Sequence, residues 1–134
     1  MRTLLVIGSE PCFNADIKAA LELRPLAELM LVNGAATLVE HAEHVLSGHS
    51  DKAEMFAVSR RKAFPNAQPW RLHATADHKG LKNLQTACPS VTDWWDKTVC
   101  TGATSAGKAI KIGLVKLGYD EVIVCGCPLD ASGY

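Results

Sequence analysis

Three short runs of apolar residues recur along the chain, and each is followed by glycine or a polar residue. They cover residues 4–7 (LLVI), 29–32 (LMLV) and 122–125 (VIVC). Runs of this length without polar alternation are typical of strands buried on both faces, as in a parallel sheet covered by helices. We therefore expect these three segments to be neighbouring inner strands of one parallel sheet.

Helical periodicity separates these runs. Asn14 is a suitable N-cap for a first helix that ends before Pro25. The pattern predicts two further helices, over residues 35–46 and 104–117, and Gly118 is placed to cap the second of them. The inner faces of the three helices are expected to carry Ile17, Ala20 and Leu21; Leu38, Ala42, Val45 and Leu46; and Ala106, Ile110, Leu114 and Leu117.

The rest of the chain gives weaker patterns. Residues 55–58 predict a third strand, residues 70–74 a less marked fourth strand and residues 98–101 another short strand, whereas residues 77–97 have no regular period. Strands that alternate with helices indicate a parallel sheet with right-handed crossovers. The expected fold class is α/β, a Rossmann-like three-layer sandwich with a mostly parallel central sheet.

Composition fits one domain over residues 1–134. The chain ends eight residues after Gly126, which favours a domain that is incomplete at its C-terminus. No apolar run approaches the length of a membrane helix, and the N-terminus lacks the features of a signal peptide, so no membrane partner is expected. Five cysteines in no framework spacing predict reduced thiols and a cytoplasmic location.

Charge is balanced overall, with 14 basic and 14 acidic residues, but residues 51–82 carry a net charge of +4. This segment could face an anionic ligand or be a solvated surface, and it lacks the interleaved aromatic residues of a nucleic-acid platform. We expect no nucleic-acid partner. The basic residues concerned are Arg60, Arg61, Lys62, Arg71, Lys79 and Lys82.

The histidines give less specific signals. His41 and His44 fall on the polar stripe of the predicted second helix, so solvent exposure is expected, and no metal site, because no third ligand follows at a known spacing. His73 and His78 lie near the basic segment and are the candidate catalytic residues, since a histidine that titrates near neutral pH can act as acid or base. The alternative is that both are loop residues without a chemical role.

The most informative stretch is residues 101–108 (TGATSAGK), where small residues and two hydroxyls precede a helix. Free backbone N–H groups and the helix dipole would favour a phosphate there, although Thr104 or Ser105 could be only the N-cap. The stretch also nearly spells a P-loop, but Ala109 stands where serine or threonine must bind magnesium. Lys108 is expected to reach solvent beside Lys111.

Both ends of the chain resemble a known group of proteins. Residues 104–107 (TSAG) and 117–127 (LGYDEVIVCGC) are similar to a pattern of short bacterial sialyltransferases and of the related glycosyltransferase-like and hydroxymethylpterin-pyrophosphokinase-like domains. Residues 6–12 (VIGSEPC) resemble the strand and glycine loop that open these domains, and residues 31–34 (LVNG) the strand end whose asparagine helps to hold the nucleotide.

The resemblance implies a nucleotide or nucleotide-sugar as ligand, a transferase activity and no further cofactor. It places the nucleotide-binding site at Gly8, Ser9, Glu10, Asn33, Gly34, Gly102, Thr104, Ser105 and Gly126. The chain departs from the pattern at Glu10, Cys12, Ala106 and Pro128, and it stops before the position of the sialyltransferase catalytic histidine. The resemblance therefore supplies a nucleotide half-site but no general base.

Three function classes stay open at this stage. They are a nucleotide-sugar-dependent transferase or its degenerate relative, a P-loop-like phosphotransferase that uses Lys108, and a non-catalytic binding module. The pair Trp94 and Trp95 could stack on a base or sugar, cover a core, or form a contact in a homo-oligomer. Cys125 is expected in the core and Cys127 in a loop.

Overall fold

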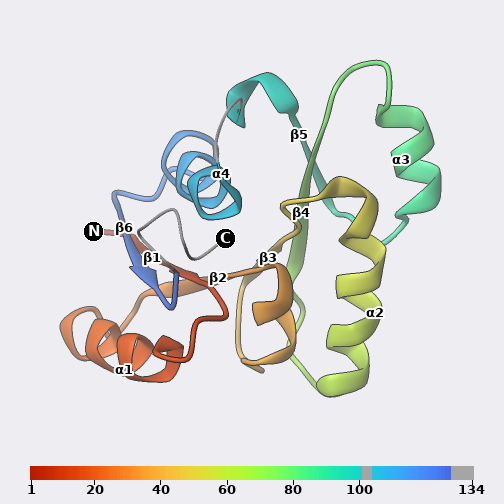
Figure 1. Cartoon of the computed structure of the whole chain (residues 1–134). Helices are drawn as coiled ribbons and strands as arrows, with labels where there is room; N and C mark the ends of the chain where they lie inside the picture. The colour runs from red at the N-terminus through yellow and green to blue at the C-terminus, as the bar shows by residue number, and fades with distance from the viewer. Residues whose placement is uncertain (101–103, 128–134) are drawn as a thin grey trace.

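The computed structural model describes residues 1–100 and 104–127, and an all-parallel sheet of six strands organises the fold of these residues (Figure 1). The strands are β1 (Thr3–Ile7), β2 (Glu28–Val32), β3 (His44–Leu46), β4 (Arg71–Ala76), β5 (Asp93–Asp96) and β6 (Glu121–Cys125). Their order is β5-β4-β3-β2-β1-β6. The expected α/β class with a parallel sheet is confirmed.

Helices cover both faces of the sheet. The main helices are α1 (Phe13–Leu23), α2 (Ala53–Ala63), α3 (Leu81–Ala87) and α4 (Ser105–Lys111), and α4 continues into the π-helical turn η4 (Ile112–Lys116). The described residues also form short 3-10 helices: η1 (Asn33–Thr37), η2 (Ser50–Lys52) and η3 (Lys97–Cys100). α1 and α4 lie on opposite sides of the strands in Figure 1, which gives the three layers.

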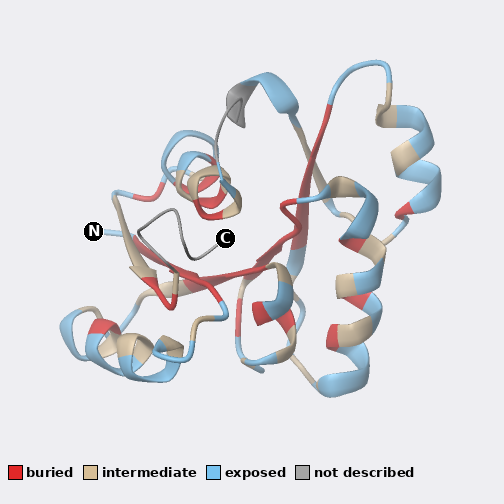
Figure 2. Ribbon diagram, viewed as in Figure 1, coloured by how far each residue is buried: buried red, intermediate tan, exposed pale blue. Residues whose placement is uncertain are grey.

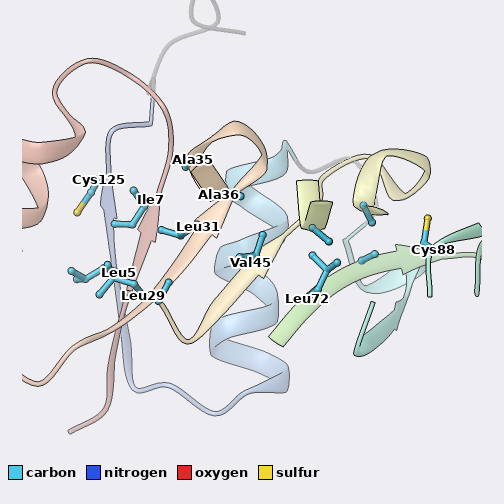
Figure 3. Close-up of a cluster of buried hydrophobic side chains, with 14 of the residues drawn as sticks. Leu5, Ile7, Leu29, Leu31, Ala35, Ala36, Val45, Leu72, Cys88 and Cys125 are labelled. Atoms are coloured by element: carbon cyan, nitrogen blue, oxygen red, sulfur yellow. The ribbon is translucent and has the colours of Figure 1, made fainter. Parts of the chain in front are cut away.

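Alternate residues of each strand enter two separate cores. Leu5, Leu29, Leu31, Val45 and Leu72 pack on the side of α1 and α2 (Figure 3). A second cluster packs under α4 and consists of Leu4, Val6, Met30, Val32, Leu46, Ala109, Ile112 and Tyr119. Both faces of the inner strands are therefore buried, as their continuous apolar runs require, whereas the outer faces of the helices are exposed (Figure 2).

The predicted strands at residues 4–7, 29–32 and 122–125 are confirmed as parallel neighbours, since β1 pairs with both β2 and β6. The expectation that all three are inner strands is wrong for β6, which lies at the edge of the sheet. The chain crosses from β5 over the face that carries α4 and adds β6 on the far side of β1. The segment 70–74 is confirmed as part of β4, which begins at Arg71.

The predicted helix over residues 35–46 is wrong. Only η1 is helical, and the chain then extends into β3, which pairs with β2 and β4. The carbonyl oxygens of Ala36, Val39 and Glu40 accept hydrogen bonds from the buried guanidinium of Arg60 instead of from backbone N–H groups. A long-range contact thus replaces the local bonds that would have built a helix.

Other differences have similar causes. Residues 55–58 belong to α2, whose inner face carries Ala53, Ala57 and Arg60, while Met55 and Val58 are exposed. Residues 77–97 are not irregular, because they contain α3 and the edge strand β5. Residues 98–100 lie in η3 rather than in a strand, and residue 101 is outside the described residues.

The first and last helices are close to expectation. α1 begins at Phe13, with Cys12 rather than Asn14 at the N-cap position. Thr104 caps α4, and Gly118 has a φ of 76°, the left-handed conformation expected after a helix. Leu114 is exposed, contrary to expectation; Ile112 and Gly113 in η4 turn inward. A Cβ on Gly113 would lie 2.7 Å from Leu4 Cδ2, so the glycine permits this close packing.

Candidate functional site

Several residues of the expected nucleotide-binding site lie at one edge of the sheet. Gly8 follows β1, Asn33 follows β2 and Gly126 follows β6, and Thr104 begins the helix that crosses back from β5. In parallel sheets this carboxyl edge is where ligands bind. These four residues therefore share one edge of the sheet, and Gly102 lies outside the described residues.

Gly8 and Gly126 lie against each other. A Cβ on Gly8 would be 2.5 Å from the carbonyl oxygen of Gly126, and Gly126 has a φ of 61°. The Gly8 N–H donates to the Cys125 carbonyl at 2.8 Å, and Asp16 Oδ2 accepts from the Gly126 N–H at 2.8 Å. The close approach of the two strand ends therefore accounts for both glycines. Ser9 is exposed and Glu10 is half-buried beside them.

A second contact joins the loops after β2 and β3 to the start of α4. Asn33 adopts φ 53°, which asparagine tolerates better than most residues, and its Oδ1 accepts from the Gly48 N–H at 2.7 Å. A Cβ on Gly48 would collide with the side chain of Ser105. Asn33 and Ser105 are thus brought together around a glycine that no sequence pattern indicates. Gly34 is exposed.

The hydroxyl of Thr104 accepts a hydrogen bond from the Gly107 N–H at 3.1 Å, so Thr104 is the N-cap of α4. The prediction that Lys108 reaches solvent beside Lys111 is wrong. The Lys108 Nζ donates to the Gly48 carbonyl at 2.9 Å, which draws the side chain across the end of β3. Two further ammonium protons of Lys108 remain to be donated.

Lys108 lines a cleft of about 310 Å³ at the carboxyl edge. We call this hollow the carboxyl-edge cleft. Lys97 and Lys108 come from the segments that lead into and along α4, whereas Asp51 and Asp77 come from the loops before α2 and α3. The other residues that line it are Gly48, His49, Ser50, Thr75, Ala76, Gly80 and Leu84. The cleft is polar and carries both signs of charge.

The two candidate histidines have different surroundings. His78 is exposed in the loop after β4 and lines a smaller hollow beside the cleft. His73 is not a loop residue, because it lies within β4 and is fully buried. His44, predicted to be exposed on a helix, is buried in β3, whereas His41 is exposed as expected.

His73 and His44 belong to a buried chain of hydrogen bonds on the sheet face that carries α4. The indole Nε1 of Trp95 donates to His73 Nδ1 at 3.0 Å, His73 Nε2 lies 2.9 Å from His44 Nδ1, and His44 Nε2 lies 2.9 Å from the hydroxyl of Tyr119. The carboxylate of Glu28 lies on the far side of this chain and raises the pKa of the Tyr119 hydroxyl. We call these side chains the histidine relay.

The direction of the histidine relay follows from its first donor. An indole N–H can only donate, so His73 Nδ1 must be the unprotonated nitrogen and Nε2 carries the hydrogen. His73 then donates to His44 Nδ1, and His44 donates from Nε2 to Tyr119. Both rings are neutral. Burial agrees with this, since it lowers the pKa of His73 to about 3 and lowers the pKa of His44.

Tyr119 ends the relay as a neutral phenol. Burial raises its pKa to about 12, and the Arg2 guanidinium lies over its ring at 4.3 Å. A donor that holds its proton this tightly is a poor acid or base at neutral pH. The histidine relay is therefore a packed, fully paired polar network, and the candidate role of His73 as a catalytic residue has no exposed atom to support it.

The basic segment does not form one surface. Arg60 is buried against carbonyl groups, and Arg71 in β4 forms a two-pronged ion pair with Asp93 at 2.5 and 2.9 Å. The Arg71 guanidinium is therefore neutralised by the carboxylate of the neighbouring strand. Of the two alternatives for this segment, a face towards an anionic ligand does not hold for Arg60 and Arg71, and a solvated surface does not hold for the buried Arg60.

The described cysteines Cys12, Cys88, Cys125 and Cys127 are free thiols. Cys125 is buried in the core, as expected, and burial raises its pKa to about 11. Burial also raises the pKa of Cys127, and a hydrogen bond to Asp16 raises that of Cys12. Cys12, Cys125 and Cys127 are therefore protonated at neutral pH and are weak nucleophiles.

Comparison of the chain with protein-family models, with curated protein sequences and with solved structures gives no match. Within residues 1–100 and 104–127, no helix is long and apolar enough to cross a membrane. The geometry of the carboxyl edge is therefore the basis for a functional proposal.

Sequence patterns miss three features of this edge: Gly48, the inward position of Lys108, and the histidine relay. The segment 47–50 (SGHS) has the small and polar residues of a loop after a strand, which is a usable signal once β3 is placed correctly. The pairing of His44 with His73 has no signal in the sequence, because the two residues are 29 positions apart.

Proposed function

We propose that this protein binds a nucleotide or nucleotide-sugar, with the phosphate groups in the carboxyl-edge cleft beside Lys108. The observation that carries the proposal is that Lys108, whose ammonium group is bonded to the Gly48 carbonyl, lines a cleft at the ligand-binding edge of a parallel sheet. A lysine held by one hydrogen bond keeps donors for phosphate oxygens.

The two lysines make one side of the cleft suitable for an anion. Lys97 and Lys108 belong to the segments that lead into and along α4, and Asp51 and Asp77 belong to the segments before α2 and α3. Asp77 Oδ1 already accepts from the Gly80 N–H at 2.7 Å, which closes the loop before α3. Phosphate is therefore expected on the α4 side, with the neutral portion of the ligand towards the loops.

Lys108→Ala is expected to weaken nucleotide binding about ten- to a hundred-fold, the usual effect of losing hydrogen bonds from a charged group to a ligand. Lys111→Ala is the matched control, because Lys111 is exposed one turn further along α4. Its loss should change Kd by no more than about five-fold. Calorimetry with the nucleotide that raises the melting temperature most would measure both. Equal losses in the two variants would contradict the proposed position of the phosphate.

The reaction class rests on the resemblance to glycosyltransferase-like domains. We propose transfer of a sugar from a nucleotide-sugar to an acceptor hydroxyl: the bond between sugar and phosphate breaks, the nucleotide leaves, and the hydroxyl oxygen bonds the sugar carbon. His49 or Asp77, both of which line the cleft, takes up the hydroxyl proton. Turnover of a labelled nucleotide-sugar tests this step. Tight binding without turnover would instead assign a non-catalytic binding module.

A P-loop-like phosphotransferase is less consistent with the geometry. Ala109, at the position of the magnesium ligand, is fully buried on the inner face of α4. The Gly107 N–H is bonded to Thr104 and is not available to a phosphate. Nucleotide affinity is therefore expected to be independent of added magnesium, and a loss of binding on chelation would favour the P-loop alternative.

A further inference from the structure

A smaller hollow adjoins the carboxyl-edge cleft. It measures about 130 Å³ and shares the lining residues Ala76 and Asp77 with the cleft. Its other residues are His78, Leu81, Trp94, Trp95 and Asp96. We call it the indole hollow. Because it lies at the carboxyl ends of β4 and β5, a ligand with phosphates in the cleft can extend into it.

The two indole rings at this hollow are held in place from opposite faces of the sheet. Trp94 packs against the core on the α1 and α2 side, and Trp95 packs against the core under α4. The Trp95 Nε1 donates to His73, and the planes of these two rings lie nearly parallel, at 14°. Both tryptophans are only partly buried. The histidine relay thus fixes the orientation of a ring that borders a solvent-accessible hollow.

Polar groups stand at the rim of the hollow. The carboxylate of Asp96 accepts hydrogen bonds from the backbone N–H and hydroxyl of Thr98, and these bonds lower its pKa, so it is ionised at neutral pH. His78 offers a ring nitrogen as donor or acceptor. A rigid indole with hydrogen-bonding groups beside it can bind a flat heteroaromatic ring. The face of the ring stacks on the indole, and the polar atoms at the edge of the ring form hydrogen bonds.

We propose that the indole hollow is the subsite for the base of the nucleotide whose phosphates occupy the carboxyl-edge cleft. This inference rests on the proposed function. It assigns Trp95 to stacking on the base, with Trp94 as a further residue of the hollow, and it gives the histidine relay a role in positioning Trp95.

The test compares inorganic diphosphate with ADP, CDP, GDP and UDP by calorimetry on the full chain. Base stacking on an aromatic side chain predicts that at least one nucleoside diphosphate binds about five- to a hundred-fold more tightly than diphosphate. Trp95→Ala should remove this preference and leave the affinity for diphosphate unchanged. Trp95→Phe keeps a stacking ring and should retain most of the preference.

Tryptophan fluorescence of the unmodified protein gives a second measurement, which does not require that a variant folds. The nucleoside diphosphate should quench the emission and diphosphate should not. Binding of diphosphate without any gain from a base would overturn the base subsite and leave the proposed function standing. A base preference that survives in Trp95→Ala, with no quenching, would place the base elsewhere. Failure of every one of these ligands to bind would overturn the proposed function itself.

Discussion

Replacing Arg60 by alanine is expected to lower the free energy of unfolding by about 3–5 kcal/mol, because three buried carbonyl groups lose their donor and a large buried side chain leaves a cavity. The Arg60 side chain is fully buried, and its guanidinium donates to the carbonyl oxygens of Ala36, Val39 and Glu40 at 2.9, 2.6 and 2.6 Å. Alanine would leave these acceptors without their charged donor. Urea denaturation of the two proteins at one pH measures the change.

Arg61→Ala is the matched control for this prediction. Arg61 is the next residue of α2, its side chain is 55% exposed, and it bonds Ser90 Oγ and lies 4.0 Å from Glu54. Its loss is expected to cost about 1 kcal/mol or less. Arg60→Lys should fall between the two variants, because an ammonium group cannot reach all three carbonyl groups in the planar arrangement of a guanidinium. Similar losses for Arg60→Ala and Arg61→Ala would contradict the structural role assigned to Arg60.

The stability of the protein is expected to fall as the pH is lowered from 6.5, because of the histidine relay. Burial lowers the pKa of His73 from 6.5 to about 3 and also lowers the pKa of His44. The unfolded chain therefore binds protons that the folded protein does not bind. The stabilisation is fully present above pH 6.5 and is lost progressively towards pH 3. A shift of one pKa unit corresponds to about 1.4 kcal/mol. His73 alone should therefore lower the free energy of unfolding by about 2 kcal/mol at about pH 5.

The measurement is the free energy of unfolding by urea between about pH 7.5 and about pH 5. Asp93, whose pKa is lowered by its hydrogen bond to Arg71, acts in the same direction but below about pH 4. His41→Ala, which removes an exposed histidine 3.0 Å from Glu43, is the control variant. Nitrogen chemical shifts should show His73 and His44 as neutral rings with the hydrogen on Nε2. Imidazolium shifts at neutral pH, or a flat stability profile, would contradict the direction of the histidine relay.

The candidate site is predictable from the sequence to a limited depth. Gly8, Asn33, Thr104 and Ser105 can be found because each stands next to a strand or helix end with a clear local signal. The contacts of these residues cannot be found from the sequence. Thr104 caps a helix, and Gly8 makes room for the end of β6. The cleft itself is formed by Gly48, Lys108 and the loops after β3 and β4, which meet only in the folded chain.

The sequence by itself determined β1, β2, β6 and the helix that begins at Ser105, because continuous apolar runs and a capped helical period are local properties of the chain. Only the tertiary structure decided that residues 44–46 form a strand and residues 55–58 a helix. Pairing of residues 44–46 with β2 and β4 outweighs their local preference for a helix. The hydrogen bonds of Arg60 to carbonyl groups 20 to 24 positions earlier in the chain contribute to the same result. The same holds for the histidine relay, since burial and pairing of distant residues set its pKa values.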